Sequence, residues 1–143
     1  MSFRLEHKLF IKKQNLIEFK DYLFKKGVSR IFTTRSVESL YFDNKNKDMY
    51  NDSIEGLTPR KKIRVRYYPS SGSKNLILEK KISSVEGRFK IGDEIKKSDF
   101  EKMKLNGIYD KQYGICFPSI FVTYTRDYFK LDDVRITIDN DIL

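Results

Sequence analysis

The chain has 143 residues, and its 39% hydrophobic and 14% aromatic content is enough for one folded core and argues against intrinsic disorder. The formal net charge of +9 favours an anionic partner, such as a nucleic acid, a phosphorylated small molecule, polyphosphate or an acidic membrane surface. No apolar run reaches the ~18–20 residues of a transmembrane helix, and the first ten residues lack the apolar segment of a signal peptide.

A single cysteine and a single histidine exclude further classes of protein. Cys116 has no partner for an intrachain disulfide, and a reducing compartment, the cytoplasm, is the simplest location. With His7 as the one histidine, the usual Cys/His zinc site is excluded, and no serine is marked as a partner for a catalytic triad. We expect Cys116 to be structural.

The first thirty residues predict a strand and a helix. Residues 3–11 alternate as a strand. One face would carry Leu5, His7, Leu9 and Ile11, and the other Arg4, Glu6, Lys8 and Phe10. His7 is therefore expected to be a core histidine. A helix is predicted over residues 16–26, with Asn15 as N-cap, Glu18 completing a capping-box-like pair, and Gly27 beyond its end.

The middle of the chain is predicted to be rich in strands. Residues 36–42 and 60–68 alternate as strands, and residues 50–55 indicate a short one. Residues 43–52 are polar and predict a turn. The segment 69–74, PSSGSK, predicts a hairpin turn. Residues 75–82 then return as the antiparallel neighbour of 60–68, and residues 85–91 indicate one more strand.

The last third predicts one helix and two strands. Ser98 and Glu101 match a capping box, so a helix is expected over residues 99–105, followed by Gly107. Residues 108–118 look irregular, whereas 119–128 and 134–139 alternate as strands. No internal repeat or linker is visible, so residues 1–143 are treated as one domain. Dominant strands, local hairpins and short helices predict an α+β fold, an antiparallel barrel with helices packed outside.

The most informative stretch is the basic strand RKKIRVRYY at residues 60–68. In a strand, Ile63, Val65 and Tyr67 share one face. The opposite face carries Arg60, Lys62, Arg64 and Arg66. Two interpretations are open. The basic face points to solvent in a half-exposed sheet, or it lines the inside of a barrel. Either way, four like charges along one strand need carboxylates or a polyanionic ligand to compensate them.

The same pairing of a charged face with an apolar face recurs on other strands. The charged faces carry Arg4, Glu6 and Lys8; Lys62, Arg64 and Arg66; Glu79 and Lys81; Arg126; and Arg135 and Asp139. If the apolar faces meet the helices, the charged faces meet each other and form a cationic bore. Arginine and lysine bind phosphate oxygens, and carboxylates beside phosphates indicate Mg²⁺ or Mn²⁺. In the alternative, Glu79 forms a mere surface ion pair with Arg64 or Arg66.

These residues resemble a known family. The motifs are R-x-E-x-K (Arg4, Glu6, Lys8), YFD (residues 41–43), K-x-R-x-R (Lys62, Arg64, Arg66), E-x-K (Glu79, Lys81), Y-x-R (Tyr124, Arg126) and R-x-T-x-D (Arg135, Thr137, Asp139). In this order they resemble the VTC domain, the polyphosphate-polymerase branch of the triphosphate tunnel metalloenzymes, or CYTH superfamily. The resemblance runs from residue 3 to the end and implies an antiparallel barrel around a tunnel that binds triphosphate or polyphosphate. It also implies transfer of the γ-phosphate of ATP to a polyphosphate chain, with Mn²⁺ or Mg²⁺ as cofactor.

The resemblance also assigns residues. It implies catalytic and phosphate-binding roles for Arg64, Arg66, Lys81, Arg126 and Arg135. Further phosphate contacts are implied for Lys8, Lys62, Arg88 and Lys90, where Arg88 and Lys90 are alternative matches to one basic position. The implied metal-binding carboxylates are Glu6, Glu79 and Asp139.

One departure from the family pattern shapes our expectations. Family members continue past R-x-T-x-D into a strand with a metal-binding glutamate and then a helical part, whereas this sequence stops at Leu143. We therefore expect a fragment or a shortened form that binds polyphosphate, turns ATP over slowly or not at all, and forms homo-oligomers through an open barrel edge. A tripolyphosphatase and a non-catalytic polyphosphate-binding module stay open as alternatives. A nucleic-acid-binding barrel is disfavoured, because Glu6 and Glu79 would repel a phosphate backbone.

Overall fold

The computed structural model describes residues 5–69 and 75–143. A 3₁₀ turn at Lys13–Asn15 precedes the first helix. The helices are α1 (Leu16–Lys25), α2 (Asp48–Glu55) and α3 (Lys97–Asn106). The strands are β1 (Ser29–Asp43), β2 (Arg60–Tyr67), β3 (Leu76–Ser84), β4 (Gly87–Ile95), β5 (Ile108–Asp110), β6 (Gly114–Leu131) and β7 (Val134–Asn140).

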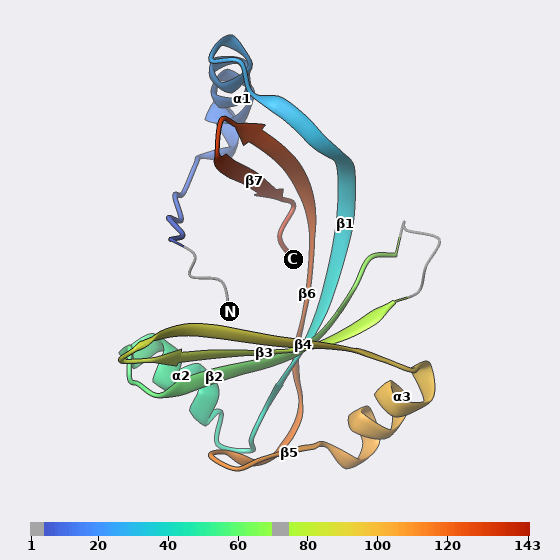
Figure 1. Cartoon of the computed structure of the whole chain (residues 1–143). Coiled ribbons are helices and arrows are strands. Elements are labelled where there is room, and N and C mark those ends of the chain that lie inside the picture. The colour runs from blue at the N-terminus through green and yellow to red at the C-terminus, as the bar shows by residue number, and fades with distance from the viewer. Residues whose placement is uncertain (1–4, 70–74) are drawn as a thin grey trace.

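All strands join one antiparallel sheet that curls into a half-barrel, with the order β4-β3-β2-β1-β6-β5 and with β7 on β6. Figure 1 shows β1 and β6 running side by side along the molecule, with β2, β3 and β4 crossing them; α1 lies at one end, and α2 and α3 lie at the other. The predicted α+β class and antiparallel barrel-like sheet are confirmed. The path does not close on itself within the described residues, so the concave side is open.

The long β1–β6 pair lies at the centre of the fold. The two strands pair from Ser29 opposite Lys130 to Asp43 opposite Phe117. Their register shifts between Arg30 and Arg35 and again after Tyr41. Such irregularities increase local twist and bend a strand. They therefore help this pair to curl the sheet and to give it one concave and one convex face.

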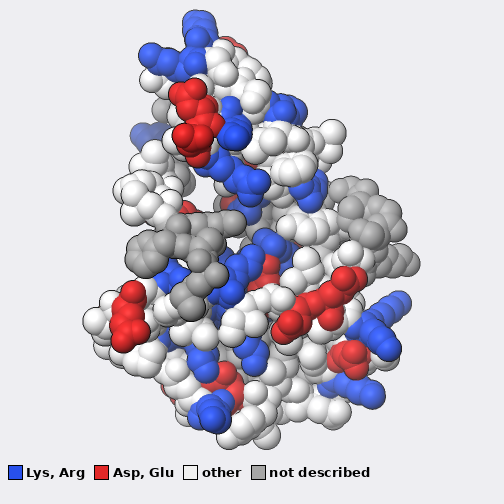
Figure 2. Space-filling view, viewed as in Figure 1, with Lys and Arg blue, Asp and Glu red and all other residues white. Residues whose placement is uncertain are grey.

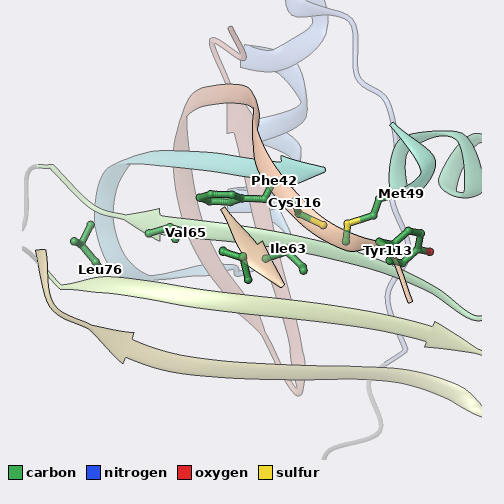
Figure 3. Close-up of a cluster of buried hydrophobic side chains, with 8 residues drawn as sticks. Phe42, Met49, Ile63, Val65, Leu76, Tyr113 and Cys116 are labelled. Carbon is green, nitrogen blue, oxygen red and sulfur yellow. The ribbon is translucent and has the colours of Figure 1, made fainter. Parts of the chain in front are cut away.

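Apolar residues of the convex face form the core under the helices. Ile63 and Val65 of β2 are fully buried and pack with Met49 of α2 and with Cys116 (Figure 3). Burial raises the pKa of the Cys116 thiol to about 11, as expected for a structural cysteine. A second cluster under α1 contains Leu23, Val28, Phe129 and Ile138. The apolar strand faces thus meet the helices, as the barrel interpretation requires.

The N-terminal strand prediction was wrong. The described part of the segment, residues 5–12, has no regular secondary structure, and His7 is exposed instead of lying in the core. Leu5, Leu9 and Phe10 are 88%, 83% and 92% exposed. Alternation gives a segment the capacity to form a strand, but a strand also has to pair with a neighbour, and the pattern carries no information on that pairing. Residues 3 and 4 lie outside the described residues.

The predicted turn within residues 43–52 is confirmed at Lys45 and Asn46, where the backbone N–H of Lys47 donates to the backbone oxygen of Asn44 at 3.0 Å. The predicted strand at 50–55 was wrong, because α2 occupies residues 48–55. Asp43, at the end of β1, explains the helix. Its carboxylate accepts backbone hydrogen bonds from Met49 at 3.0 Å and from Tyr50 at 3.0 Å. These bonds satisfy N–H groups in the first turn that have no partner within the helix. The cap lies too far along the chain for a local capping motif to reveal it.

Two helix predictions were correct in place, and Asn15 and Gly27 flank α1 as predicted, but neither predicted capping box forms. Helix α1 ends before Gly27, whose φ of 89° suits glycine, yet the Asn15 side chain makes no capping hydrogen bond. Helix α3 begins at Lys97, so Ser98 lies inside the helix and not at its N-cap.

Most predicted strands of the middle and last parts of the chain are present in the structure, but their boundaries differ from the predicted ones. Strands β2 and β3 pair antiparallel as predicted, and most of the turn that joins them, residues 70–74, lies outside the described residues. The segment 108–118, predicted to be irregular, contains β5 and the start of β6. No described helix has the length and apolar character needed to cross a membrane.

Within the described residues, part of β6 has no neighbour on one side, in addition to the outer edges of β4 and β7. On the side of β6 away from β1, β5 pairs as far as Cys116 and β7 pairs from Thr125, and Leu143 exchanges backbone hydrogen bonds with Thr123. Within the described chain, no strand pairs with residues 117–122 on that side. The association of copies through such an edge stays a prediction, which sedimentation velocity would test.

Candidate functional site

The charged strand faces meet on the concave side of the sheet. Directly opposed residues of an antiparallel pair share a face, and Lys62 of β2 is opposite Lys81 of β3, which is opposite Lys90 of β4. We call these three residues the lysine row. Neighbouring strands lie about 4.8 Å apart, so the row places three ammonium groups across the sheet at short intervals. Next to it, Arg64 is opposite Glu79.

Glu79 is the carboxylate at the centre of this face, and it is 1% exposed. Its Oε2 accepts from Arg64 at 2.7 Å, and its Oε1 accepts from Arg66 at 2.6 Å and from Lys90 at 2.9 Å. Burial alone would raise the pKa of Glu79, but the Lys90 hydrogen bond and the charges of Arg64 and Arg66 outweigh it and lower that pKa. Glu79 therefore stays ionised. Its ion pairs with Arg64 and Arg66 are buried, so they are not the surface ion pair of the half-exposed-sheet interpretation.

Arg64 is fixed on two sides. Its Nη1 donates to the hydroxyl of Tyr41 on β1 at 3.0 Å, and its side chain is 8% exposed. Burial lowers the pKa of Arg64, but Tyr41 and Glu79 more than offset this and raise it above its usual value. The guanidinium is thus a permanent charge held in one orientation at the floor of the concave face.

The lysine row carries charge that a single carboxylate does not neutralise. Desolvation, followed by repulsion from Arg64, lowers the pKa of Lys81 to about 8, although the residue keeps exposed surface. Desolvation also lowers the pKa of Lys62, and the charge of Lys8 adds to this effect. Lys8 therefore lies close enough to act electrostatically on the row. Five cations, Lys62, Arg64, Arg66, Lys81 and Lys90, share this face of β2, β3 and β4 with two carboxylates, the buried Glu79 and the exposed Glu94. The remaining positive charge favours a polyanionic ligand.

A second basic group lies farther along the concave face. Arg126 of β6 is paired with Asp139 of β7 by two hydrogen bonds, Nε to Oδ1 at 2.6 Å and Nη2 to Oδ2 at 2.8 Å. The bond to Asp139 is the main reason that the pKa of Arg126 is raised. Arg135 is exposed and lies opposite Lys130. Figure 2 shows Lys and Arg side chains gathered between the α1 end of the molecule and the β2–β3–β4 layer.

The predicted phosphate-binding residues thus divide into those that the fold gathers and those that stay at its margin. Lys62, Arg64, Arg66, Lys81 and Lys90 come together, and Arg126 and Arg135 share their face. Arg88 lies opposite Ser83 and is exposed at the rim, so Lys90 is the closer of the two alternative matches to Glu79. Arg4 lies outside the described residues.

The predicted metal-binding carboxylates are not gathered into one site. Glu6 is exposed beside Lys8 at 3.8 Å, Glu79 is engaged by three cations, and Asp139 is engaged by Arg126. The part of the chain that the structure describes contains no group of three or more His, Cys, Asp or Glu residues placed to hold a cation. As placed, these donors do not fit a resident Mn²⁺ or Mg²⁺ ion, which prefers several oxygen ligands. The metal requirement stays a prediction of the family resemblance.

Two features of the face were not recognised in the sequence. Arg35 and Ser39 of β1 also lie on the concave side, because Arg35 is opposite Arg126 and Ser39 is opposite Arg66. Arg35 lies one residue before the strand predicted at 36–42. Tyr41 belongs to the YFD motif, but its hydroxyl bond to Arg64 follows from strand pairing that one sequence does not reveal.

A cavity of about 600 Å³ adjoins the floor of the face beside α2. Tyr41 and Lys62 line it from the concave side, Ile120 and Val122 line it from β6, and Tyr50 lines it from α2. Its volume lies in the range of small-molecule sites. The basic floor therefore continues into a space with mostly apolar walls.

The chain resembles known proteins in its sequence and in its fold. A family model described as the VTC domain matches residues 3–143, essentially the whole chain. Among solved structures, the chain is similar to the PH1819 protein from Pyrococcus horikoshii OT3, with a TM-score of 0.55 and 19% sequence identity. That similarity covers 85% of this chain and 66% of the other, just under two thirds of its length, and at this identity it shows the fold alone. No curated protein matches the chain.

Proposed function

Because this chain belongs to the VTC domain family, we propose that its concave basic face binds a triphosphate or polyphosphate chain. The observation that carries the proposal is the excess of positive charge around Glu79, where five cations on β2, β3 and β4 share a face with two carboxylates, the buried Glu79 and the exposed Glu94. A linear polyanion supplies several negative charges at short intervals. It would therefore neutralise the lysine row and the two arginines together.

The reaction that fits this site best is phosphoryl transfer from ATP to the end of a polyphosphate chain. A terminal oxygen of the acceptor chain forms a new bond to the γ-phosphorus of ATP, the bond to the β,γ-bridging oxygen breaks, and ADP leaves. Positioning and charge neutralisation carry most of the catalysis in such a reaction. Arg64, held by Tyr41 and Glu79, would orient the phosphates, and Lys62 and Lys81 would offset the negative charge of two converging chains.

The test is to incubate the protein with ATP, with and without Mn²⁺, and to measure polyphosphate and free phosphate. Binding of long-chain polyphosphate and of single-stranded DNA is measured in parallel at the same ionic strength. Polyphosphate as product identifies a polymerase, free phosphate identifies a hydrolase, and polyphosphate binding without turnover identifies a binding module. DNA binding as tight as polyphosphate binding would contradict the proposal and favour a nucleic-acid-binding face.

The lowered pKa of Lys81, about 8, predicts that phosphate binding depends on pH. Below this pH the free protein already carries the Lys81 charge. As the pH rises through 8 the charge is lost, so the affinity for tripolyphosphate should fall between about pH 7 and pH 9. Calorimetric titrations across this range measure the change. Lys81→Arg, which stays charged throughout, should flatten the profile, and an unchanged slope in this variant would show that another group titrates.

A further inference from the structure

Arg35 is held by three aromatic rings rather than by acceptors. Its guanidinium carbon lies 4.7 Å from the ring centroid of Phe32, 4.7 Å from that of Tyr128 and 5.1 Å from that of Tyr68. Stacking on ring faces fixes a planar guanidinium while leaving its N–H donors free to bind an anion. Among residues 5–69 and 75–143, no hydrogen bond or ion pair engages these donors.

The position of Arg35 in the sheet adds to this unbalanced charge. Arg35 lies directly opposite Arg126, and the carboxylate of Asp139 is fully engaged by Arg126. Like charges in directly opposed positions destabilise an antiparallel pair. Asp139 balances the charge of Arg126, whereas no carboxylate of the described residues pairs with Arg35, so an anion that reaches Arg35 would supply the missing negative charge.

The Tyr68 ring lies between Arg35 and Arg66, one of the cations around Glu79. The guanidinium carbon of Arg66 lies 5.4 Å from the Tyr68 ring centroid, so Arg35 and Arg66 both contact this ring. Because Arg66 is opposite Ser39, Arg35 lies four residues farther along β1. At the rise of a strand, this separation is roughly 13 Å along the sheet.

We propose that Arg35 forms a second phosphate subsite at the far end of the concave face, which only a long phosphate chain reaches. This inference rests on the proposed function. A triphosphate seated on the lysine row and Arg64 is expected to end before Arg35. A longer polyphosphate passes Arg66 and Tyr68 and brings a more distant phosphate to Arg35, where its oxygens accept hydrogen bonds from the guanidinium. Arg35 would thus give the site a preference for long phosphate chains over tripolyphosphate.

The test compares tripolyphosphate with long-chain polyphosphate, at fixed ionic strength, on wild-type protein and three variants. Arg35→Leu fills the space between the rings and removes both the charge and the donors. Arg35→Lys keeps the charge and loses the planar fork. Arg30→Gln is the matched control, because Arg30 lies on the same strand but contacts Asp127 on the convex side, where Lys20 remains paired with that carboxylate at 2.9 Å.

We expect Arg35→Leu to weaken long-chain binding roughly tenfold to a hundredfold, as for one lost charge-assisted contact, and to leave tripolyphosphate binding within about twofold of wild type. Arg35→Lys should be intermediate for long chains, and Arg30→Gln should resemble wild type for both ligands. Thermal unfolding midpoints of all variants control for the fold, and Arg35→Lys carries the test if Arg35→Leu does not fold.

If the Arg35 variants bind long-chain polyphosphate as tightly as the wild-type protein does, the inference is wrong. An equal loss for both ligands would also overturn it, because Arg35 would then belong to the main site. Failure of the wild-type protein to bind either ligand would overturn the proposed function itself, and the inference with it.

Discussion

Glu79→Gln is expected to lower the free energy of unfolding by about 3–5 kcal/mol, as when one partner of a buried ion pair is removed. The 1%-exposed carboxylate holds Arg64, Arg66 and Lys90 together, and a neutral amide would leave their charges uncompensated. Urea unfolding monitored by circular dichroism measures the loss. The matched control is Glu101→Gln, which breaks an exposed helical pair with Lys104 at 2.8 Å and should cost less than about 1 kcal/mol.

Tripolyphosphate should partly restore the stability of Glu79→Gln, because a ligand that binds only the folded state stabilises it by mass action. The phosphates would supply the negative charge that the variant lacks. A variant as stable as wild type without ligand would contradict the view that Glu79 organises the concave face.

Protonation of Glu79 makes the free energy of unfolding depend on pH. Because the pKa of Glu79 is lowered by folding, its contribution is present above the unfolded-state pKa of about 4.3. The contribution is lost as the pH falls through the lower folded-state value. Wild-type protein should therefore lose stability on acidification below about pH 5, and Glu79→Gln should lose less over the same range.

Arg64→Ala and Arg66→Ala are each expected to weaken tripolyphosphate binding by about 1.5–3 kcal/mol, the range for a hydrogen bond to a charged group. Both side chains lie mid-strand on the concave face, and each is held by Glu79 in a fixed orientation. Arg60→Ala is the control on the same strand. Arg60 lies at the strand start and donates to the backbone oxygen of Leu57 at 3.2 Å, so its loss should matter less.

Calorimetric titration of the three variants separates these cases. If all three bind like wild type, the concave face does not bind the phosphate chain. If Arg60→Ala loses as much affinity as the other two, general electrostatic attraction explains binding better than a defined site does.

Strand periodicity revealed the concave face because charged residues alternate with β-branched ones along β2. Ile63 and Val65 had to be buried, and this requirement fixed the side on which Arg64 and Arg66 lie. The antiparallel pairing of β2 with β3 was predicted from the hairpin between two such strands, whereas the register that sets Lys62 opposite Lys81 came from the structure. Local pattern was therefore sufficient wherever a strand had one clearly apolar face.

The pattern failed where tertiary contacts decide the outcome. Register shifts between Arg30 and Arg35 interrupt the alternation of β1, so the start of this strand and the direction of Arg35 were not visible in the sequence. Helix α2 depends on a cap from Asp43, at the end of the preceding strand. The metal-binding role of Glu79 and Asp139 stays a prediction, but the sequence did not reveal that arginines engage the oxygens of both carboxylates.

Lysine footprinting tests the proposed phosphate-binding face most directly. Lys62, Lys81 and Lys90 keep exposed surface in the free protein, as do Lys45 and Lys102 elsewhere, so all five are open to amine acetylation. With long-chain polyphosphate present, mass spectrometry should show reduced acetylation at Lys62, Lys81 and Lys90 and unchanged acetylation at Lys45 and Lys102. Equal protection of all five lysines, or acetylation of the lysine row unaffected by polyphosphate, would contradict a phosphate-binding site on the concave face.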